Sequence, residues 1–492
     1  MKSFLRFVLI AVLAGFFTGC EKPDNPGGGN ESATPRLTLM NTAITFEAEG
    51  GTISVSFLAN MAWTASSDQP WLTLNPASGS GAESKQSVSV VASANTGAER
   101  TAKVTFRMGE LSAELSVSQK KDPNYIPITT LAEFRKKPVD ETTWYKISGV
   151  IVSQPEDQYG NFFIVDETSY VYVYGLCEKQ VGKGGNDQSF SKLGLKPGDT
   201  VTMMSLRSVY NDTIEAGGQT PAYFVSKTSG NYTLGKKMAV TTAKWMELPA
   251  TSATDGQDLL IHCFPDATRS YAAYWDYKNF VSSWVAYPLH SGNIGSGGRT
   301  ADGAFPMDPL LSRSQQPYLP KGYVEGNAGK YDRGHQIPSA DRLDWRVNLE
   351  TFFSTNMTPQ DNGLNAEAWE RLENKVRSWA RSSETDTLYV VTGCSVKGST
   401  KYCMDADDKK VTVPVGYYKA LLRLAKDKSY SAVGFWFNNE PNSAGSIQKS
   451  MSMSIDALEE KVGVDFFVNL PDDVEKSVEA QNPAEVAWWW NN

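Results

Sequence analysis

Histidine and cysteine are scarce in this sequence: its 492 residues include 3 His and 5 Cys. No group of Cys and His has the spacing of a four-ligand zinc site, which argues against zinc. After the first seventeen residues there is also no apolar run long enough to span a bilayer. A hydrophobic fraction of 40%, with 21 Phe, 21 Tyr and 13 Trp, excludes a largely disordered chain. At roughly 100–200 residues per domain, the length predicts two to four domains.

The sequence also lacks an excess of basic residues, because 47 Lys and Arg stand against 55 Asp and Glu. The acidic excess is uneven. Residues 1–240 and 241–440 each contain 22 basic and 23 acidic side chains, whereas the last 52 residues contain 3 and 9. Most of the net charge of −8 therefore lies in the C-terminal tail. The charge excludes only a uniformly basic nucleic-acid binder, not nucleic acid as a partner.

The N-terminus has the form of an export signal. Lys2 and Arg6 precede an apolar run that ends at Phe17, too short for a permanent transmembrane helix. The following Thr18-Gly19-Cys20 resembles a bacterial lipobox, which implies lipidation of Cys20. We therefore expect a lipoprotein signal peptide over 1–20, a flexible tether rich in Pro, Gly, Asn and Ser over 21–35, and a cell-envelope lipoprotein, held at the outer membrane and facing the periplasm or the surface.

Residues 36–120 alternate apolar and polar side chains in short runs separated by Gly, Asn and Ser, which predicts an all-β immunoglobulin-like sandwich. Trp63-Thr-Ala, Trp71-Leu-Thr-Leu-Asn-Pro-Ala-Ser-Gly, Arg100 and Val117-Ser-Gln resemble the BACON domain. That resemblance implies contact of residues 36–120 with glycans, through aromatic side chains that stack on sugars. The alternative is a spacer whose Trp63 and Trp71 belong to the core.

Residues 124–235 contain a second all-β series. Three predicted strands, a Gly- and Ser-rich loop and two further strands resemble an OB-fold barrel. Five aromatic side chains could form a stacking platform for single-stranded nucleic acid: Tyr159, Phe162, Tyr170, Tyr172 and Tyr174. The same side chains could equally be core residues of a scaffold.

Residues 240–490 mix helix and strand signals and predict an α+β domain with a central sheet. Its chemical residues gather in one stretch that contains Asp332-Arg-Gly-His335 and an amphipathic helix over 366–383. Asn365 and Glu373 lie about two helical turns apart, on broadly the same side. A histidine base, an amide oxygen, a carboxylate and guanidinium groups are the components of metal-assisted phosphodiester hydrolysis.

The order of motifs resembles that of the DNA/RNA non-specific endonucleases, a ββα-metal family with a DRGH signature. The matching segments are Trp284-Val-Ala-Tyr, Asp332-Arg-Gly-His335, Asn356-Met-Thr-Pro-Gln, Leu364-Asn-Ala-Glu-Ala-Trp, Leu388-Tyr-Val-Val-Thr-Gly, Val413-Pro-Val-Gly-Tyr-Tyr-Lys, Gly463-Val-Asp-Phe-Phe and Asn469-Leu-Pro. The resemblance implies a nuclease domain over 240–490 that hydrolyses DNA and RNA.

The resemblance also implies residue roles. His335 would be the general base, and an ordinary pKa near 6.5 would suit that role. Asn365 would be the direct ligand of Mg²⁺ or Mn²⁺. Glu373 would hold a metal-bound water, Arg333 would contact the phosphate or position the site, and Arg299 would bind phosphate from a diverged loop. Asn356 would shape the loop beside the site, and His262 and His290 would be core or surface residues.

Two other functions remain open from the sequence. One is a carbohydrate- or surface-binding lipoprotein with an inert nuclease-like domain, and the other is a phosphodiesterase acting on small substrates. Cys394 and Cys403 could form a disulfide in an exported protein, whereas Cys177 and Cys263 are expected as buried thiols. The sequence does not define the oligomeric state.

Overall fold

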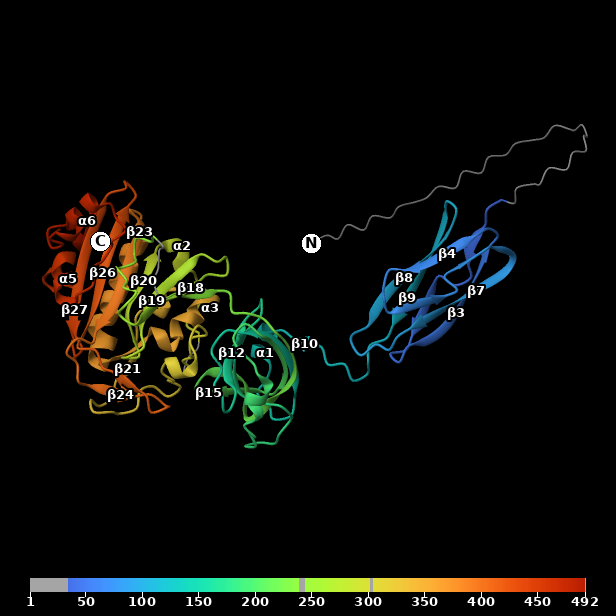
Figure 1. Cartoon of the computed structure of the whole chain (residues 1–492), viewed down its shortest axis with the longest axis horizontal. Coiled ribbons are helices and arrows are strands. Elements are labelled where there is room, and N and C mark those ends of the chain that lie inside the picture. Colours follow the sequence, from blue (N-terminus) through green and yellow to red (C-terminus); the bar gives the residue numbers. More distant parts are fainter. Residues whose placement is uncertain (1–33, 239–243, 301–303, 492) are drawn as a thin grey trace, which may run out of the picture. The chain divides into compact units, whose positions relative to one another are not determined.

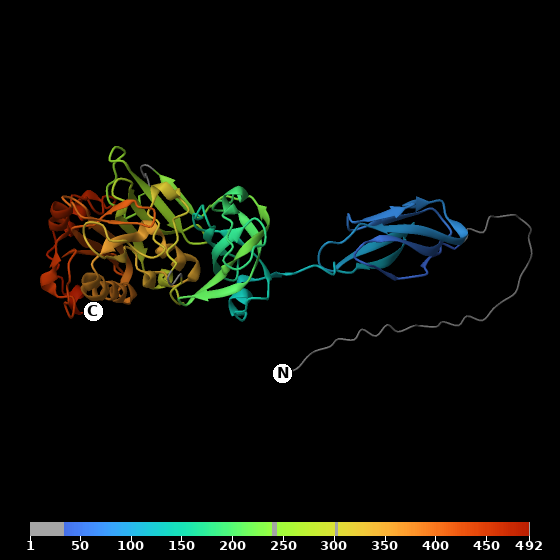
Figure 2. The same ribbon diagram turned by 90° about the horizontal axis from the view of Figure 1, so that it is seen from below.

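Strands dominate the computed structural model, which describes residues 34–238, 244–300 and 304–491 (Figure 1, Figure 2). The predicted signal peptide, Cys20 and most of the tether lie outside these residues. The chain divides into two units, Met1–Tyr125 and Ile126–Asn492. No helix within the described ranges combines the length and the apolar character needed to cross a membrane.

The first unit consists of two sheets that share one core. The first sheet has the order β1-β3-β7-β5 and the second β2-β9-β8-β4-β6. Side chains from both sheets, among them Phe57 and Phe106, form a single buried cluster. The predicted alternating runs all fall within its strands. The strands are β1 (Leu37–Leu39), β2 (Ala43–Phe46), β3 (Gly51–Ala59), β4 (Trp63–Ser67), β5 (Leu72–Asn75), β6 (Ser78–Gly79), β7 (Ala82–Ala92), β8 (Arg100–Met108) and β9 (Leu111–Gln119).

The two tryptophans of this unit belong to its structure. Trp63 is 3% exposed, and its indole nitrogen donates to Gln86 Oε1 at 2.9 Å. Trp71 is half-buried, with the guanidinium of Arg100 4.4 Å from its ring centroid. A buried ring has no face free for a sugar, so the glycan-stacking hypothesis is wrong for Trp63.

The second unit begins with a closed barrel of five strands. Its strands pair in the order β11-β12-β13-β16-β14, and β14 pairs again with β11 to close the ring. The OB-fold assignment for residues 124–235 stays a prediction, and the barrel is its structural basis. The elements here are β10 (Ile128–Thr129), α1 (Leu131–Lys136), β11 (Tyr145–Ile151), β12 (Asn161–Val165), β13 (Tyr170–Cys177), β14 (Thr200–Ser205), β15 (Arg207–Tyr210) and β16 (Thr213–Thr228).

An antiparallel sheet of eight strands forms the centre of the rest of the unit, in the order β17-β18-β19-β20-β23-β26-β27-β28. Two sheets of two strands each, β21–β22 and β24–β25, lie outside this sheet. The strands are β17 (Gly235–Met238), β18 (Gln257–Cys263), β19 (Arg269–Asp276), β20 (Val281–Leu289), β21 (Asp332–His335), β22 (Met357–Gln360), β23 (Thr385–Ser395), β24 (Tyr402–Met404), β25 (Lys410–Thr412), β26 (Gly416–Ala425), β27 (Tyr430–Asn438) and β28 (Ser452–Met453).

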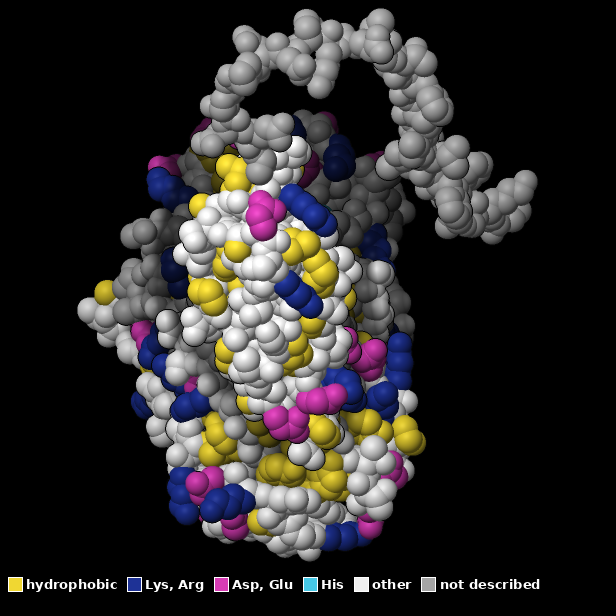
Figure 3. All heavy atoms as spheres, turned by 90° about the vertical axis from the view of Figure 1, so that its right-hand side faces the viewer, with side chains coloured by type: hydrophobic (Ala, Val, Ile, Leu, Met, Phe, Trp, Pro, Cys, Tyr) yellow, Lys and Arg dark blue, Asp and Glu magenta, His cyan; other side chains and the backbone are white. Residues whose placement is uncertain are grey.

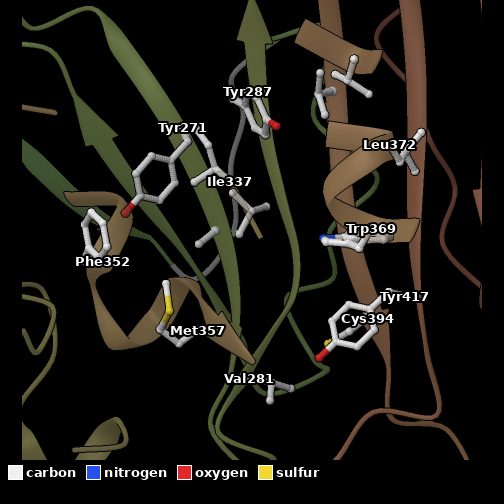
Figure 4. Close-up of a cluster of buried hydrophobic side chains, with 14 of the residues drawn as sticks. Tyr271, Val281, Tyr287, Ile337, Phe352, Met357, Trp369, Leu372, Cys394 and Tyr417 are labelled. Atoms are coloured by element: carbon white, nitrogen blue, oxygen red, sulfur yellow. The ribbon is translucent and has the colours of Figure 1, made fainter. Parts of the chain in front are cut away.

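Each face of the sheet has its own core, because successive strand side chains point to opposite faces. On β26, Tyr417 belongs to the cluster shown in Figure 4 and Tyr418 to the cluster on the other face. Helix α4 packs with the first cluster, and α5 and α6 pack with the second. The helices are α2 (Ser291–Ile294), α3 (Trp345–Asn348), α4 (Glu370–Arg381), α5 (Ile455–Val462), α6 (Asp472–Glu479) and α7 (Ala487–Asn491).

The helix predicted over 366–383 has an unexpected beginning. Residues Leu364–Trp369 form a π-helical turn, and the α-helix starts at Glu370. The backbone N–H of Ala368 donates to Asn442 O, outside the helix, at 3.1 Å. Helix α5 begins regularly, with the Ser454 side chain as its N-cap, which accepts from the Ala457 N–H.

Charge is mixed on the surface. On the face shown in Figure 3, Lys and Arg side chains lie among Asp and Glu side chains and form no uniformly basic surface. This distribution agrees with the near balance of charge over residues 1–440.

Candidate active site

The DRGH segment forms strand β21, which pairs with β22 so that His335 lies opposite Met357. The side-chain amide of Asn356 holds the chain next to this pair of strands through hydrogen bonds. Its side-chain nitrogen donates to Ile337 O at 2.9 Å and to Thr351 O at 2.7 Å, and its oxygen accepts from the Ile337 N–H at 2.9 Å. Asn356 is fully buried, so its predicted role in shaping the loop is confirmed.

His335 lies between two phenylalanine rings. Phe352 meets it edge-on at a centroid distance of 5.0 Å, and Phe305 lies 6.2 Å away. The His335 Nε2 atom is buried and has no hydrogen-bond partner in the described chain. Burial, together with the positive charges of Arg299 and Arg333, lowers the pKa of His335 to about 3. The pKa of His335 therefore lies well below the ordinary value near 6.5, and the imidazole is a neutral proton acceptor at neutral pH.

Two arginines carry positive charge to this histidine: Arg333 from the same strand, β21, and Arg299 from a segment earlier in the chain. The Arg333 guanidinium lies 3.5 Å from the Phe305 ring centroid and donates to Leu319 O at 2.8 Å. The Arg299 guanidinium lies 4.6 Å from the Phe352 centroid. Each cation thus stacks on one of the two rings that flank His335. The structure brings Arg299, the weakest match in sequence, into the same site as His335 and Arg333.

Asn365 is tied to the first residue of β21. Its side-chain nitrogen donates to Asp332 Oδ2 at 3.0 Å, and Asn362 donates to the same oxygen at 2.9 Å. The π-helical turn that contains Asn365 begins after Asp361, whose carboxylate accepts from the Gly363 N–H at 2.8 Å. Asn365 uses its amide nitrogen in the contact with Asp332, which leaves the amide oxygen for a ligand.

Glu373 lies in a different electrostatic setting, three residues into α4. Burial raises its pKa, while the positive charges of Lys419 and Arg377 act in the opposite direction. Lys419 is fully buried on β26 and donates to Thr392 Oγ1 at 3.0 Å. Arg377 forms an ion pair of 2.9 Å with Asp341. Within the described part of the chain, Glu373 makes no hydrogen bond with His335 or Asn365, so the structure does not join it directly to them.

The oxygen donors near β21 suit a hard divalent cation. Asn365 offers an amide oxygen and Asp332 a carboxylate, and these are ligand types that Mg²⁺ prefers. The nearby His335 lacks a protein partner for Nε2. The residues present therefore fit a metal ion held through few protein ligands.

A cleft of about 1130 Å³ separates the barrel from the larger sheet domain and reaches Arg333 and Phe305. On the barrel side it is lined by four tyrosines, of which Tyr159, Tyr174 and Tyr210 are 41%, 48% and 65% exposed. Phe162 is 1% exposed and belongs to the barrel core, so its predicted place in a stacking platform is wrong. Tyr170 packs instead on Trp345, at a centroid distance of 6.0 Å. The fourth lining tyrosine is Tyr172.

The barrel is fastened beside the site by direct contacts. The Gln154 N–H donates to Met307 O at 3.0 Å, two residues after Phe305. Arg313 pairs with Glu156 of the barrel and with Asp407 of the sheet domain, both at 2.6 Å. The Glu156 side chain is almost fully buried in this contact.

Asp332 and Asn362 had no predicted role in the site, yet both take part in the contacts of Asn365 with β21. The signal in the sequence was Asp332 itself, the first residue of the DRGH motif. Successive side chains of a strand point to opposite faces, so Asp332 and Arg333 have different surroundings and can have different roles. His262 is a core residue as expected, with its Nε2 3.0 Å from Asp308 Oδ2.

The possible disulfide is not formed, since Cys394 and Cys403 are both free. Their thiols donate to Ser282 O and Val411 O respectively, which directs them to separate strands.

A neutral imidazole flanked by two guanidinium groups, with amide and carboxylate oxygens on the neighbouring segments, is a set of groups that suits metal-assisted phosphodiester hydrolysis. Two family models match the chain. The DNA/RNA non-specific endonuclease model covers residues 264–473, and the BACON model covers residues 61–120.

Known nucleases are similar to the same region. A nuclease of Nostoc sp. is 30% identical over 222 residues, which is 43% of this chain and 76% of that protein. A nuclease of Serratia marcescens is 29% identical over 205 residues, covering 41% and 73% of the two chains. Human mitochondrial endonuclease G is 25% identical over 211 residues, covering 41% and 69%. The chain belongs to the DNA/RNA non-specific endonuclease family and carries a BACON domain at its N-terminal side.

Proposed function

We propose that this chain is a Mg²⁺-dependent endonuclease that cleaves both DNA and RNA and leaves 5′-phosphate ends. Membership of the endonuclease family supports the reaction, and the oxygen donors of Asn365 and Asp332 support the metal. The observation that carries the proposal is the buried Nε2 of His335, a base without a protein partner beside two arginines.

The protein residues divide the work of hydrolysis. Arg299 and Arg333 bind the phosphate that is to be cleaved, and its negative charge offsets the two positive charges that lower the His335 pKa. Substrate therefore strengthens His335 as a base at the moment when it is needed. Its Nε2 then takes a proton from the attacking water. Phe305 and Phe352 hold the imidazole and both guanidinium groups in place.

Asn365 would hold the metal through its side-chain oxygen, and the Asp332 carboxylate would orient that amide. When bound, Mg²⁺ would supply positive charge that stabilises the charge developing on the phosphate and on the leaving oxygen. Glu373 would use its carboxylate to hold a water molecule that is bound to the ion. Helix α4, which also carries Arg377, sets the position of this side chain.

The cleft favours a polymer over a small phosphodiester as substrate. It runs from Arg333 to exposed tyrosines of the barrel, so a chain bound at the site has stacking partners for its neighbouring bases. A dinucleotide would use only the end of the cleft near Arg333. Glycan contact by residues 36–120 stays a separate proposal, which binding of the intact protein to glycans would test.

We further propose that lipidation of Cys20 tethers the enzyme to the cell envelope, at the outer membrane. The apolar run ending at Phe17 and the following Cys20 support this location. Replacement of Cys20 by Ala should move the protein from the membrane fraction to a soluble fraction, and an unchanged membrane fraction would refute the tether.

Digestion of plasmid DNA and of RNA by the purified protein tests the activity. We expect cleavage with Mg²⁺, none with excess EDTA, and a loss of at least about 10³-fold for His335→Ala. His290→Ala is the matched control, because that histidine caps the short helix α2 and has no place in the site. Equal cleavage by wild type and His335→Ala would refute the proposed base.

A further inference from the structure

Three carboxylates meet on the sheet face opposite to the active site. Asp456 and Glu459 lie one turn apart on α5, and Glu479 is the last residue of α6. One carboxylate oxygen of each lies within 4.8 Å of the others. Both helices pack with the cluster on the far face of the sheet, whereas Ile337 and Phe352, next to the site, belong to the near cluster. The group is therefore separate from the proposed catalytic machinery.

Glu479 needs a partner that the described chain does not supply. Its side chain is 6% exposed, and its Oε1 atom has no hydrogen-bond partner among the described residues. Burial raises its pKa to about 8, and each of the charged neighbours that add to this shift is acidic: Glu459, Glu475, Asp456 and Asp465. A buried oxygen with no donor is costly, and surrounding negative charge increases the cost.

Glu459 is a partly buried carboxylate that also lies among acidic side chains. One of its oxygens accepts from the Phe466 N–H at 2.7 Å, yet burial and the neighbouring acids still raise its pKa to about 7. Five of the nine acidic residues in the C-terminal tail thus act on one another in this small region: Asp456, Glu459, Asp465, Glu475 and Glu479.

We propose that Asp456, Glu459 and Glu479 bind a calcium ion that fastens α5 to α6. Three carboxylates provide only oxygen donors, and the absence of His and Cys from the group excludes a zinc-type ligand set. Calcium accepts six to eight oxygens in flexible geometry, including carboxylates that bind through one or both oxygens. Magnesium retains most of its waters and is seldom held by protein carboxylates alone, so calcium is the better occupant.

The ion would stabilise the connection between the two helices. That connection contains Phe466, Phe467 and Leu470, all buried against the sheet. Bound calcium would neutralise the carboxylates that repel one another and give the buried Glu479 oxygen its missing partner. The role is structural, and the inference does not depend on the proposed nuclease activity.

Thermal unfolding of the mature full-length chain tests the site. Asn365→Ala serves as the background, which removes the proposed catalytic ligand for divalent ions. We expect CaCl₂ at neutral pH to raise the unfolding temperature by several degrees Celsius, and isothermal titration to show one calcium per chain. Glu479→Gln and Asp456→Asn should each abolish both responses. Glu460→Gln is the matched control, because Glu460 is an exposed neighbour on α5 outside the group.

A calcium response of the same size in Glu479→Gln, Asp456→Asn and the control would overturn the proposal. The absence of a calcium response in all of these proteins would also overturn it. So would stabilisation by MgCl₂ at the same concentration and to the same extent. Asp456 is exposed, so Asp456→Asn keeps the test valid if the buried Glu479 variant fails to fold.

Discussion

The side-chain amide of Asn365 donates to the Asp332 carboxylate across 3.0 Å. This contact joins the first residue of β21 to the π-helical turn before α4, two segments separated by 28 intervening residues. Because the amide nitrogen of Asn365 is used in this contact, its amide oxygen is the atom that can bind a cation. Asp332 is therefore a positioning residue for the proposed metal ligand.

Replacement of Asp332 by Ala should lower Mg²⁺-dependent cleavage by about 10- to 100-fold, the usual effect of losing a residue that orients a ligand. The Mg²⁺ concentration for half-maximal activity should also rise, because the Asn365 amide can then rotate. A metal titration of the cleavage rate measures both effects. Asn362→Ala, which removes the other amide on the same carboxylate, should have a smaller effect. Unchanged metal dependence of Asp332→Ala would contradict this role.

Replacement of Arg299 by Ala should raise the pKa of His335. Positive charge disfavours protonation of a nearby imidazole, so its removal favours the charged form. The acidic limb of the kcat/KM profile should then move to higher pH than in the wild type, where burial and the two arginines lower that pKa to about 3. Arg299→Lys retains the charge and should keep the limb near its wild-type position. If the acidic limb of the profile stays at the same pH in Arg299→Ala, the charge of Arg299 does not act on His335.

The barrel tyrosines provide a test of substrate length. Tyr174→Ala should raise KM for single-stranded polynucleotide by about tenfold, because base stacking on an aromatic side chain contributes about 1–3 kcal/mol. Cleavage of a dinucleotide should change little, since it does not reach the barrel. Val225→Ala is the control, an exposed barrel residue outside the cleft. An equal loss on both substrates would indicate that Tyr174 acts on folding and not on binding.

Glu479 should make stability depend on pH in the absence of calcium. Its folded pKa of about 8 lies above the ordinary value of 4.5, so the folded state binds this proton more tightly than the unfolded state. The free energy of unfolding should therefore fall as pH rises from about 4.5 to about 8. Glu479→Gln lacks this titration, and its free energy of unfolding should fall less over the same window. Denaturant unfolding of both proteins in EDTA measures the difference, and parallel curves would show that Glu479 does not contribute.

Much of the architecture could be predicted from local patterns. The alternating runs of residues 36–120 fall in strands, and the amphipathic stretch predicted over 366–383 contains α4. These features depend on neighbours in sequence, so the sequence contains the information directly. The π-helical turn at Leu364–Trp369 was not predictable in this way, because the Ala368 N–H donates to Asn442, 74 residues further along the chain.

The ordered motifs were enough to identify the family and to name His335, Asn365, Glu373, Arg333 and Arg299 as candidates for the chemistry. Only the tertiary structure decided their chemical state. His335 has a low pKa because Phe305 and Phe352 bury it and because Arg299 and Arg333 converge on it from different segments. Burial and electrostatic potential are sums over neighbours in space. The same reason applies to the nine acidic residues in the tail. In the sequence they show only a net negative charge, whereas the packing of α5 against α6 brings five of them close together.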